Sequence, residues 1–239
     1  MNSPENKSAA VRSMFGSIAP RYDLLNHLLS LNIDKRWRRA AVDVLLRGAK
    51  SDGQFLDGCA GTLDLGLELA RRGRFTGRVT AYDFSFPMLE RGVPKLGAIG
   101  APDPVDVVCA DALVLPFRDR TFDGATVGFG VRNLVDLDAG FREAARVLKP
   151  GGRLVVLEFT TPSLKPFRDL YLWYFTKVLP WIGRRISGHD SAYTYLPDTV
   201  LNFPQPKALA ARMTTAGFRD VGFRTLTGGI AAIHYGTRV

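Results

Sequence analysis

The chain has 239 residues, 46% hydrophobic and 23% charged, which is typical of a globular domain with one sizeable core. A formal net charge of +9 favours anionic partners, either nucleic acid or acidic lipid, although the Lys and Arg residues form no long run. The two cysteines and three scattered histidines exclude a disulfide framework and a Cys/His metal site. The absence of an apolar run of ~18 residues excludes a membrane-spanning helix. With no signal-peptide pattern either, we expect a soluble cytoplasmic protein.

Residues 1–50 are expected to be helical after a frayed start. Residues 1–10 are small and polar, and we expect them to fray. The leucines with helical spacing in the segment that follows are Leu25, Leu28 and Leu29. Asp34 is the predicted N-cap of a second helix, because it directly precedes a stretch with apolar residues at helical spacing.

From residue 54 onward, predicted strands and helices alternate. Short apolar runs predict strands at residues 54–57, 79–83, 105–109, 124–127 and 153–159. Helices with apolar residues on one face are predicted to begin at Asp64, at Ser85 and at Asp136 or Asp138. Strands that are apolar on both faces and alternate with helices favour a parallel sheet covered by helices on both sides.

Residues 163–205 interrupt this alternation, because they are rich in aromatic residues and contain several prolines. Apolar residues between 167 and 181 follow helical spacing and predict a helix that packs on the core. Trp173, Trp181 and the Arg184-Arg185 pair add aromatic and cationic groups to this segment. They favour contact with lipid at the inner face of a membrane, with substrate, or with a second subunit in a homodimer.

The last part of the chain returns to regular elements. A helix is predicted at 207–216, ending at Gly217, and two strands at 218–226 and 230–237. We find no internal repeat and no low-complexity linker, so a single α/β domain with a helical insertion is expected.

Small and acidic residues gather where the predicted strands end, which is where ligands bind in open α/β sheets. Residues 57–61 follow the first strand, and their small side chains let a ligand approach the backbone. Asp83, about 20 residues after Gly61, suits the two hydroxyls of a ribose, and Asp111 with Ala112 suits an adenine ring. The alternative is a tight turn without a ligand, since a dinucleotide-binding loop needs three glycines where only Gly61 is present.

The chain resembles a known family at several places. The loop after the first strand, residues 115–117 with 121–123, and residues 148–152 are similar to class I S-adenosyl-L-methionine-dependent methyltransferases. More specific motifs resemble the ubiquinone/menaquinone-biosynthesis C-methyltransferases and extend from about residue 11 to the end of the chain. These motifs are residues 14–15, 18–23, 129–133, 157–159, 193–196 and 226–230, with Ala232 and His234.

The resemblance implies a Rossmann-like class I methyltransferase fold, with a seven-stranded, mostly parallel sheet whose last strand is reversed. It implies C-methylation of a polyprenylated quinol with S-adenosylmethionine, most directly demethylmenaquinol to menaquinol. A polyprenyl-methoxy-benzoquinol of ubiquinone biosynthesis is the alternative substrate. The cofactor contacts carried over by the resemblance are Thr62, Asp83, Asp111 and Ala112, and the strand-end loop adds Asp57 and Gly61.

The expected division of the single domain, 1–239, follows from these motifs. Its predicted parts are N-terminal helices at 1–50, a cofactor-binding core at 54–160, a helical substrate or lid insertion at 163–205, and a C-terminal helix with a strand pair at 206–239.

Methylation of a ring carbon requires positioning of the quinol and loss of its hydroxyl proton, and it needs no metal. Arg132 and Asn133 follow the fourth strand, where the ring is expected, and are the predicted catalytic residues. Arg132 is permanently charged and therefore suits a phenolate or a water better than the role of a base. The alternative is a structural ion pair between Arg132 and Asp136. Secondary substrate candidates, each equally compatible with structural hydrogen bonding, are Tyr22, Asp23, Tyr195 and His234.

Three positions near the expected cofactor depart from the family pattern. Leu63 stands where the family usually has glycine, and a branched side chain there is expected to crowd the methionine portion if the backbone has a positive φ. Gly58 and Gly128 replace side chains that are more common in the family. We expect the cofactor to bind nonetheless, because both carboxylate positions are present.

Other functional classes remain as alternatives. One is a methyltransferase of a small phenol or a sterol, and another is a weak or inactive relative that acts as a scaffold in quinone synthesis. A nucleic-acid-modifying enzyme is disfavoured despite the charge, because the sequence has no groove motif that combines aromatic and basic residues.

Overall fold

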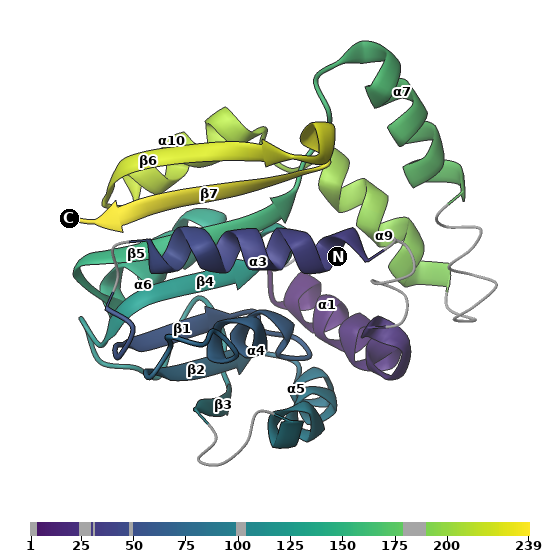
Figure 1. The fold of residues 1–239 in the computed structure, drawn as a ribbon. Coiled ribbons are helices and arrows are strands. Elements are labelled where there is room, and N and C mark those ends of the chain that lie inside the picture. The colour runs from purple at the N-terminus through teal and green to yellow at the C-terminus, as the bar shows by residue number, and fades with distance from the viewer. Residues whose placement is uncertain (1–3, 24–29, 31, 48–49, 99–103, 179–189) are drawn as a thin grey trace.

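The computed structural model describes residues 4–23, 30, 32–47, 50–98, 104–178 and 190–239. Within these residues, seven strands form one sheet in the order β3-β2-β1-β4-β5-β7-β6 (Figure 1). The strands are β1 (Gln54–Gly58), β2 (Arg78–Asp83), β3 (Val105–Cys109), β4 (Phe122–Gly128), β5 (Leu148–Phe159), β6 (Phe218–Leu226) and β7 (Ala231–Arg238). The neighbours from β3 to β5 pair in parallel, whereas β7 is antiparallel to both β5 and β6. The predicted mostly parallel sheet with a reversed last strand is thus confirmed.

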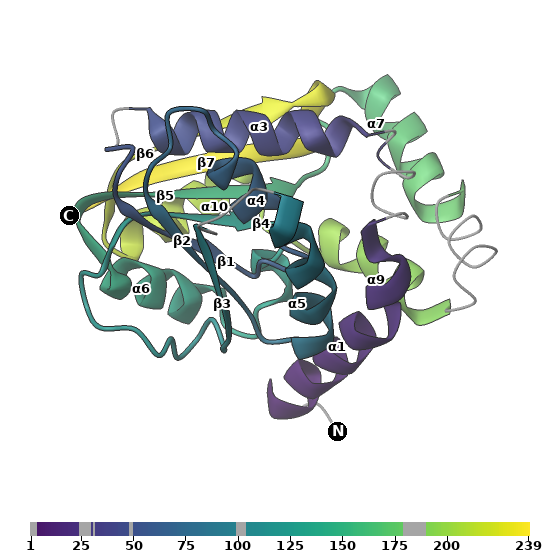
Figure 2. The same ribbon diagram turned by 60° about the horizontal axis from the view of Figure 1, so that its bottom comes forward.

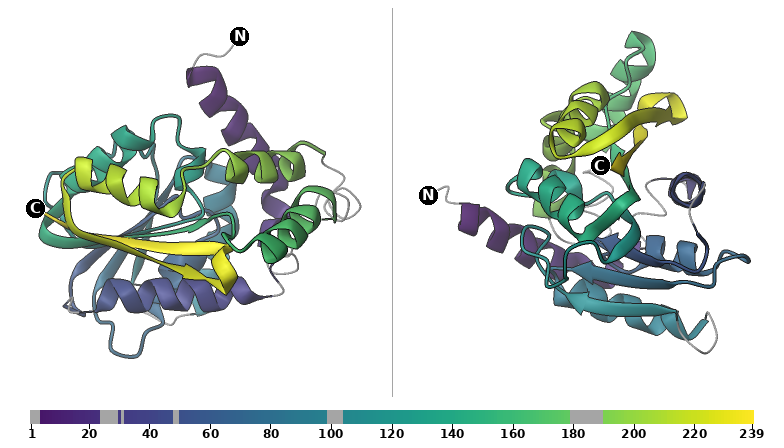
Figure 3. Two further views of the ribbon diagram at one scale, coloured as in Figure 1. Left: turned by 90° about the horizontal axis from the view of Figure 1, so that it is seen from above. Right: turned by 90° about the vertical axis from the view of Figure 1, so that its left-hand side faces the viewer.

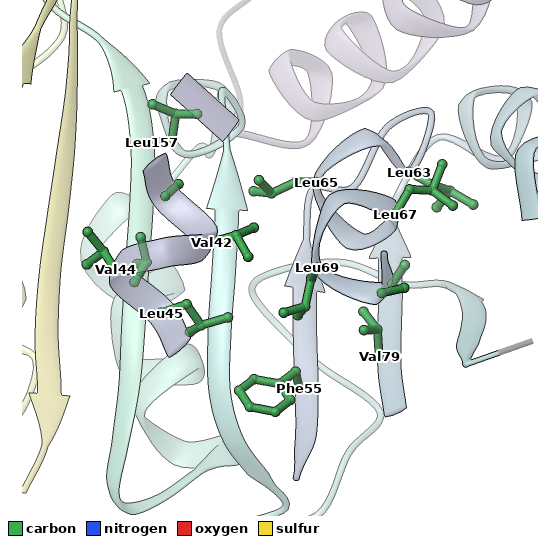
Figure 4. Packing of buried hydrophobic residues seen from close by; sticks show 14 of the residues in the cluster. Val42, Val44, Leu45, Phe55, Leu63, Leu65, Leu67, Leu69, Val79 and Leu157 are labelled. Carbon is green, nitrogen blue, oxygen red and sulfur yellow. The ribbon is translucent and has the colours of Figure 1, made fainter. Parts of the chain in front are cut away.

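Helices cover both faces of the sheet (Figure 3). On one face lie α3 (Ile33–Leu46), α4 (Asp64–Ala70) and α5 (Phe86–Gly92), and on the other lie α6 (Leu137–Val147) and α10 (Pro206–Thr215). Each face has its own apolar core. Val42 and Leu45 of α3 pack with Leu69 of α4 and Phe55 of β1 on the first face (Figure 4). Such two-sided burial explains why the central strands are apolar throughout.

A third group of helices lies beyond the end of the sheet towards which β4 and β5 point (Figure 1). It comprises α1 (Pro4–Ile18), α7 (Lys165–Trp173), the π-helical turn η4 (Tyr174–Val178) and α9 (Asp190–Leu201). A small core of Ile18, Tyr171, Phe175 and Val200 joins them. In its described residues the insertion is helical, as predicted, and it packs against the N-terminal helix. In Figure 2, α1 lies next to both α5 and α9.

Two expectations for the N-terminal region are wrong. Residues from Pro4 onward belong to α1 rather than to a frayed end, because Val11 and Ile18 find apolar neighbours only in the folded chain. The N-cap of α3 is Asn32, with a φ of 60°, and Asp34 lies in the first turn, where it forms a buried ion pair with Arg38. The leucines expected to form an earlier helix, Leu25, Leu28 and Leu29, lie outside the described residues.

A buried carboxylate connects the centre of the sheet to α4. Asp57 is fully buried, and its Oδ2 accepts a hydrogen bond from the backbone N–H of Gly66 at 2.7 Å, while its Oδ1 accepts one from the Thr126 hydroxyl at 3.0 Å. These contacts join β1, α4 and β4. Burial raises the pKa of Asp57 from 3.8 to about 7, although both hydrogen bonds act in the opposite direction.

We predict that Asp57→Asn flattens the pH dependence of stability. The folded chain keeps the Asp57 proton up to about pH 7, whereas the unfolded chain loses it near pH 3.8. The wild type therefore loses stability as pH rises between these values, by up to about 4 kcal/mol. Asn has no proton to lose and can still accept from Gly66 and donate to Thr126. Urea unfolding of both proteins at several pH values between about 5 and 8 checks this, and parallel stability curves would contradict it.

Candidate active site

A pocket lies beyond the carboxyl ends of the four strands β1 to β4, the edge at which the sequence predicts ligand binding. The loops after these strands supply most of its wall, and α1 closes one side with Ser8 and Phe15. Of the predicted site residues, those that line the pocket are Tyr22, Gly61, Asp83, Asp111, Ala112 and Asn133.

Backbone strain occurs in two of the loops that form this pocket. Cys59 and Leu63 after β1, and Phe129 after β4, have φ values of 50°, 70° and 57° although none is glycine. A left-handed backbone costs such residues roughly 1–2 kcal/mol, and strain of this kind gathers at functional sites. Gly130 lets the two loops meet, since a Cβ there would lie 2.2 Å from the Cβ of Cys59. The strained loops of the two central strands therefore form the floor of the pocket.

Asp83 holds the loop after β1 in place. Its Oδ2 accepts a hydrogen bond from the backbone N–H of Gly61 at 2.9 Å, and its Oδ1 accepts one from that of Ser85 at 2.8 Å. Burial raises the pKa of Asp83, while these backbone hydrogen bonds lower it. A carboxylate oxygen has two lone pairs, so this side chain can still accept hydrogen bonds from a diol in the pocket.

The wall after β3 is built by Asp111 and Ala112. The Asp111 Oδ1 accepts a hydrogen bond from the backbone N–H of Leu113 at 2.9 Å, which fixes the turn and leaves the carboxylate exposed beside the pocket. Ala112 is buried and keeps the wall flat, as an aromatic ring requires. This arrangement agrees with the adenine role expected from the sequence, which remains a prediction.

Two residues predicted to contact the cofactor do not line the pocket. Asp57 is satisfied by Gly66 and Thr126 beneath the loop, so its predicted direct contact is replaced by a positioning role. The Thr62 hydroxyl donates to the Asp23 carboxylate, and the Thr62 carbonyl accepts from Lys95 at 3.0 Å. Lys95 also forms an ion pair with Asp23, so these side chains connect the N-terminal segment to the strand-end loop.

Leu63 corrects another expectation. Its φ of 70° is the left-handed value that a glycine would adopt freely, but its side chain does not point at the pocket. The side chain is fully buried in the core (Figure 4). It lies against Gly92 of α5, where an added Cβ would lie 2.4 Å from the Leu63 Cγ. The departure from glycine therefore places an apolar side chain in the core, apart from the residues that line the pocket.

Arg132 has a partner that the sequence did not reveal. Its Nη1 donates to Glu158 Oε1 at 2.7 Å and to the backbone carbonyl of Phe129, and both charged side chains are almost fully buried. The ion pair is thus with Glu158 rather than with Asp136, whose carboxylate caps α6. The guanidinium carbon lies 5.5 Å from the centre of the Phe159 ring. A charged residue within the apolar motif 157–159 was the available signal for Glu158.

The remaining candidates divide into two groups. Asn133 lines the pocket, and its Oδ1 accepts a hydrogen bond from the Tyr195 hydroxyl of α9 at 3.1 Å, so these two predicted residues lie together. Tyr22 also lines the pocket, and its ring lies edge-on to that of Phe15, with 6.2 Å between the ring centroids. His234 is a correction: it is buried within β7, and its Nε2 is bonded to the carbonyl of Pro206. Burial lowers its pKa to about 4, so it is neutral and structural.

The described part of the chain has neither a membrane-spanning helix nor a cluster of metal ligands. None of its helices combines the length and the apolar character needed to cross a bilayer. Nor do its His, Cys, Asp and Glu residues form a group of three or more with the arrangement of a metal site.

The chain is similar to known proteins over almost its whole length. A profile of the ubiE/COQ5 methyltransferase family matches residues 3–238. Demethylmenaquinone methyltransferase of Thermus thermophilus is 49% identical over 225 residues, which cover 94% of this chain and 100% of that protein. The ubiquinone/menaquinone biosynthesis C-methyltransferase UbiE of Geobacter sp. strain M21 is 47% identical over 232 residues, 97% of each chain.

The fold is also found among solved structures. A SAM-dependent methyltransferase from Aquifex aeolicus superimposes with a TM-score of 0.59 at 18% identity, covering 83% of this chain and 89% of that one. The predicted Rossmann-like class I methyltransferase fold is thereby confirmed.

We predict that Leu63→Gly lowers stability without tightening the binding of S-adenosylmethionine. The lost burial outweighs the relief of a positive φ, leaving a net cost of about 1–3 kcal/mol. Leu63→Ala is the matched control: it loses the same packing but keeps the strain, so it should be the less stable variant. Denaturant unfolding and calorimetric titration measure both effects. Tighter binding by Leu63→Gly would restore the steric explanation, and a more stable Leu63→Ala would refute the strain argument.

Proposed function

The chain belongs to the ubiE/COQ5 methyltransferase family, and on that premise we propose that it converts demethylmenaquinol to menaquinol. It is a C-methyltransferase of quinone biosynthesis that uses S-adenosylmethionine. The observation that carries the proposal is the pocket in which Asp83 and Asp111 end two adjacent strands beside a buried arginine. Relatives that bear the menaquinone-only name, from Thermus thermophilus and Deinococcus radiodurans, favour the naphthoquinol.

The pocket residues fit this cofactor. The loop at Gly61 is open, with the flexible end of Met88 as the nearest atom to a Cβ built there, at 3.3 Å. The Asp83 carboxylate can accept from both ribose hydroxyls, and Asp111 with Ala112 can hold the adenine. When bound, S-adenosylmethionine supplies an electrophilic methyl group. Phe129 and Asn133 line the part of the pocket nearest Arg132, where the substrate ring would meet that group.

Arg132 is proposed to stabilise the ionised hydroxyl of the quinol. Deprotonation makes the neighbouring ring carbon nucleophilic, and a positive charge in a dry site favours the phenolate. Glu158 fixes one edge of the guanidinium through Nη1, while Nε is buried without a hydrogen-bond partner. Such an unpaired donor is costly unless a ligand satisfies it. Asn133, held by Tyr195, can orient the second quinol oxygen.

The competing functions differ in what they require of this site. A scaffold needs no cofactor, and its best support was Leu63, whose side chain is turned into the core. A benzoquinol carries methoxy groups that a naphthoquinol lacks, so the two substrates make different demands on the space beside Phe129.

We predict that the protein with S-adenosylmethionine and demethylmenaquinol under reducing conditions yields a quinol heavier by one methylene group. The same incubation with the demethylated benzoquinol should yield less product at equal concentration. Mass spectrometry of the extracted quinones measures both. A preference for the benzoquinol would contradict the naphthoquinol assignment, and lack of product from either substrate would leave a scaffold or a different acceptor.

We also propose that α7 binds an anionic membrane surface, from which a polyprenylated substrate would enter. Three apolar side chains of this segment are strongly exposed: Leu164 (69%), Leu170 (63%) and Trp173 (58%). Two exposed lysines, Lys165 and Lys177, belong to the same segment, and the chain carries a net charge of +9. Exposed apolar and aromatic groups beside cations suit the interface of a bilayer with acidic lipids. In Figure 1, α7 projects outward beside the active-site end of the sheet.

The membrane proposal predicts that Leu170→Ser with Trp173→Ser weakens binding to phosphatidylglycerol vesicles by at least about tenfold, because the buried apolar area is lost. Val114→Ser is the matched control, since Val114 is 76% exposed but lies on another surface. Vesicle sedimentation provides the measurement. Equal binding by the double variant, or equal binding of the wild type to neutral phosphatidylcholine vesicles, would contradict an electrostatic and apolar docking surface on α7.

A further inference from the structure

The insertion carries a buried tyrosine whose hydroxyl has no partner. Tyr171 of α7 is only 7% exposed, and its hydroxyl makes no hydrogen bond. A hydroxyl removed from water without a partner costs about 1–3 kcal/mol, whereas phenylalanine would fill the same space at no such cost. Its ring stacks on Phe175 at 5.0 Å between centroids, so packing alone would be satisfied by either residue. Packing therefore does not explain why this position carries a hydroxyl group.

Arg132 is joined to the same cluster of aromatic rings as this hydroxyl. Burial raises the pKa of Tyr171, and the nearby cation of Arg132 acts against that rise. The two residues are also linked by aromatic rings: the Arg132 guanidinium lies over Phe159, Phe159 contacts Phe175 at 6.3 Å between centroids, and Phe175 stacks on Tyr171. Arg132 Nε is a second buried donor without a partner. Two unsatisfied donors thus belong to one aromatic cluster at the ends of β4 and β5.

The position of Tyr171 in α7 connects this cluster to the outer surface. The preceding residue, Leu170, is 63% exposed, whereas Tyr171 points into the small core shared by α1, η4 and α9. One turn of helix therefore presents an apolar side chain outward and an unpaired hydroxyl inward.

The geometry points to Tyr171 as a substrate-binding residue whose hydroxyl, together with Arg132 Nε, donates a hydrogen bond to the ionised ring oxygen of the quinol. This inference rests on the proposed function, since it names the groups that would recognise the substrate of that reaction. Two donors on one oxygen would favour its ionised form and so help the adjacent carbon to accept the methyl group. Nothing covalent forms at Tyr171.

The test compares wild type with Tyr171→Phe, which removes only the hydroxyl. We expect kcat/KM for demethylmenaquinol to fall about ten- to a hundredfold, the size expected for a lost hydrogen bond to a charged oxygen, with an unchanged KM for S-adenosylmethionine. The rise of kcat/KM with pH should move to higher pH, because the bound quinol ionises less readily. Thermal stability should be equal or higher, since an unpaired buried hydroxyl is gone. Tyr235→Phe, on β7 away from the pocket, should change none of these quantities.

Quinol affinity without S-adenosylmethionine, from quenching of tryptophan fluorescence by demethylmenaquinol, separates this inference from the proposed reaction. An active wild type with unchanged kcat/KM, pH profile and quinol affinity in Tyr171→Phe would overturn the role of Tyr171 and leave the proposed function standing. An inactive wild type whose quinol affinity still falls in Tyr171→Phe would support the site and reject the reaction. An inactive wild type with equal affinities would overturn both.

Discussion

The geometry of the active site depends on one buried carboxylate, Asp57. It fixes the first turn of α4 to β1 through Gly66, and it fixes β1 to β4 through Thr126. Gly66 must be small for this contact, because a Cβ there would lie 3.0 Å from Asp57 Oδ2. With both ends anchored, the intervening loop is short enough to be forced into left-handed conformations at Cys59, Gly61 and Leu63. The strain is offset by hydrogen bonds within the protein, in which the N–H of Ala60 donates to the Tyr82 carbonyl and that of Gly61 to Asp83.

One side of the pocket has a different origin from its floor. The floor consists of loops between strands and helices that neighbour each other in sequence. That side is closed by α1 with Ser8 and Phe15, and α1 meets the insertion between β5 and α10 through the core of Ile18, Tyr171, Phe175 and Val200. The sheet and its loops thus form most of the pocket, while the added helices lie beside it. This division agrees with the general observation that function resides in sites grafted on shared folds.

Features set by local sequence were predictable, and features set by contacts between distant residues were not. Apolar runs and caps predict the strands and most helices, and the rule that ligands bind at strand ends places Asp83, Asp111 and Ala112 correctly at the pocket. The direction of the Leu63 side chain depends on the space left by Gly92, and the partner of Arg132 depends on β4 pairing with β5. The helical state of residues 4–10 was missed for the same reason, since the apolar residues of α1 are few and gain their neighbours only in the folded chain.

The ion pair of Arg132 with Glu158 shows why contacts between residues distant in the sequence matter for chemistry. Burial of two charges is costly, and an ion pair in the interior is weak evidence of a contribution to stability. Burying an arginine at this depth without a partner would cost more free energy. The electrostatic effect of a surface arginine would be screened by water. Glu158 engages Nη1, and the Phe129 carbonyl accepts from the same nitrogen, so the guanidinium is held with Nε still free. A donor that is fixed before the substrate arrives needs no reorganisation when negative charge develops, which is where an electrostatic contribution to catalysis is largest.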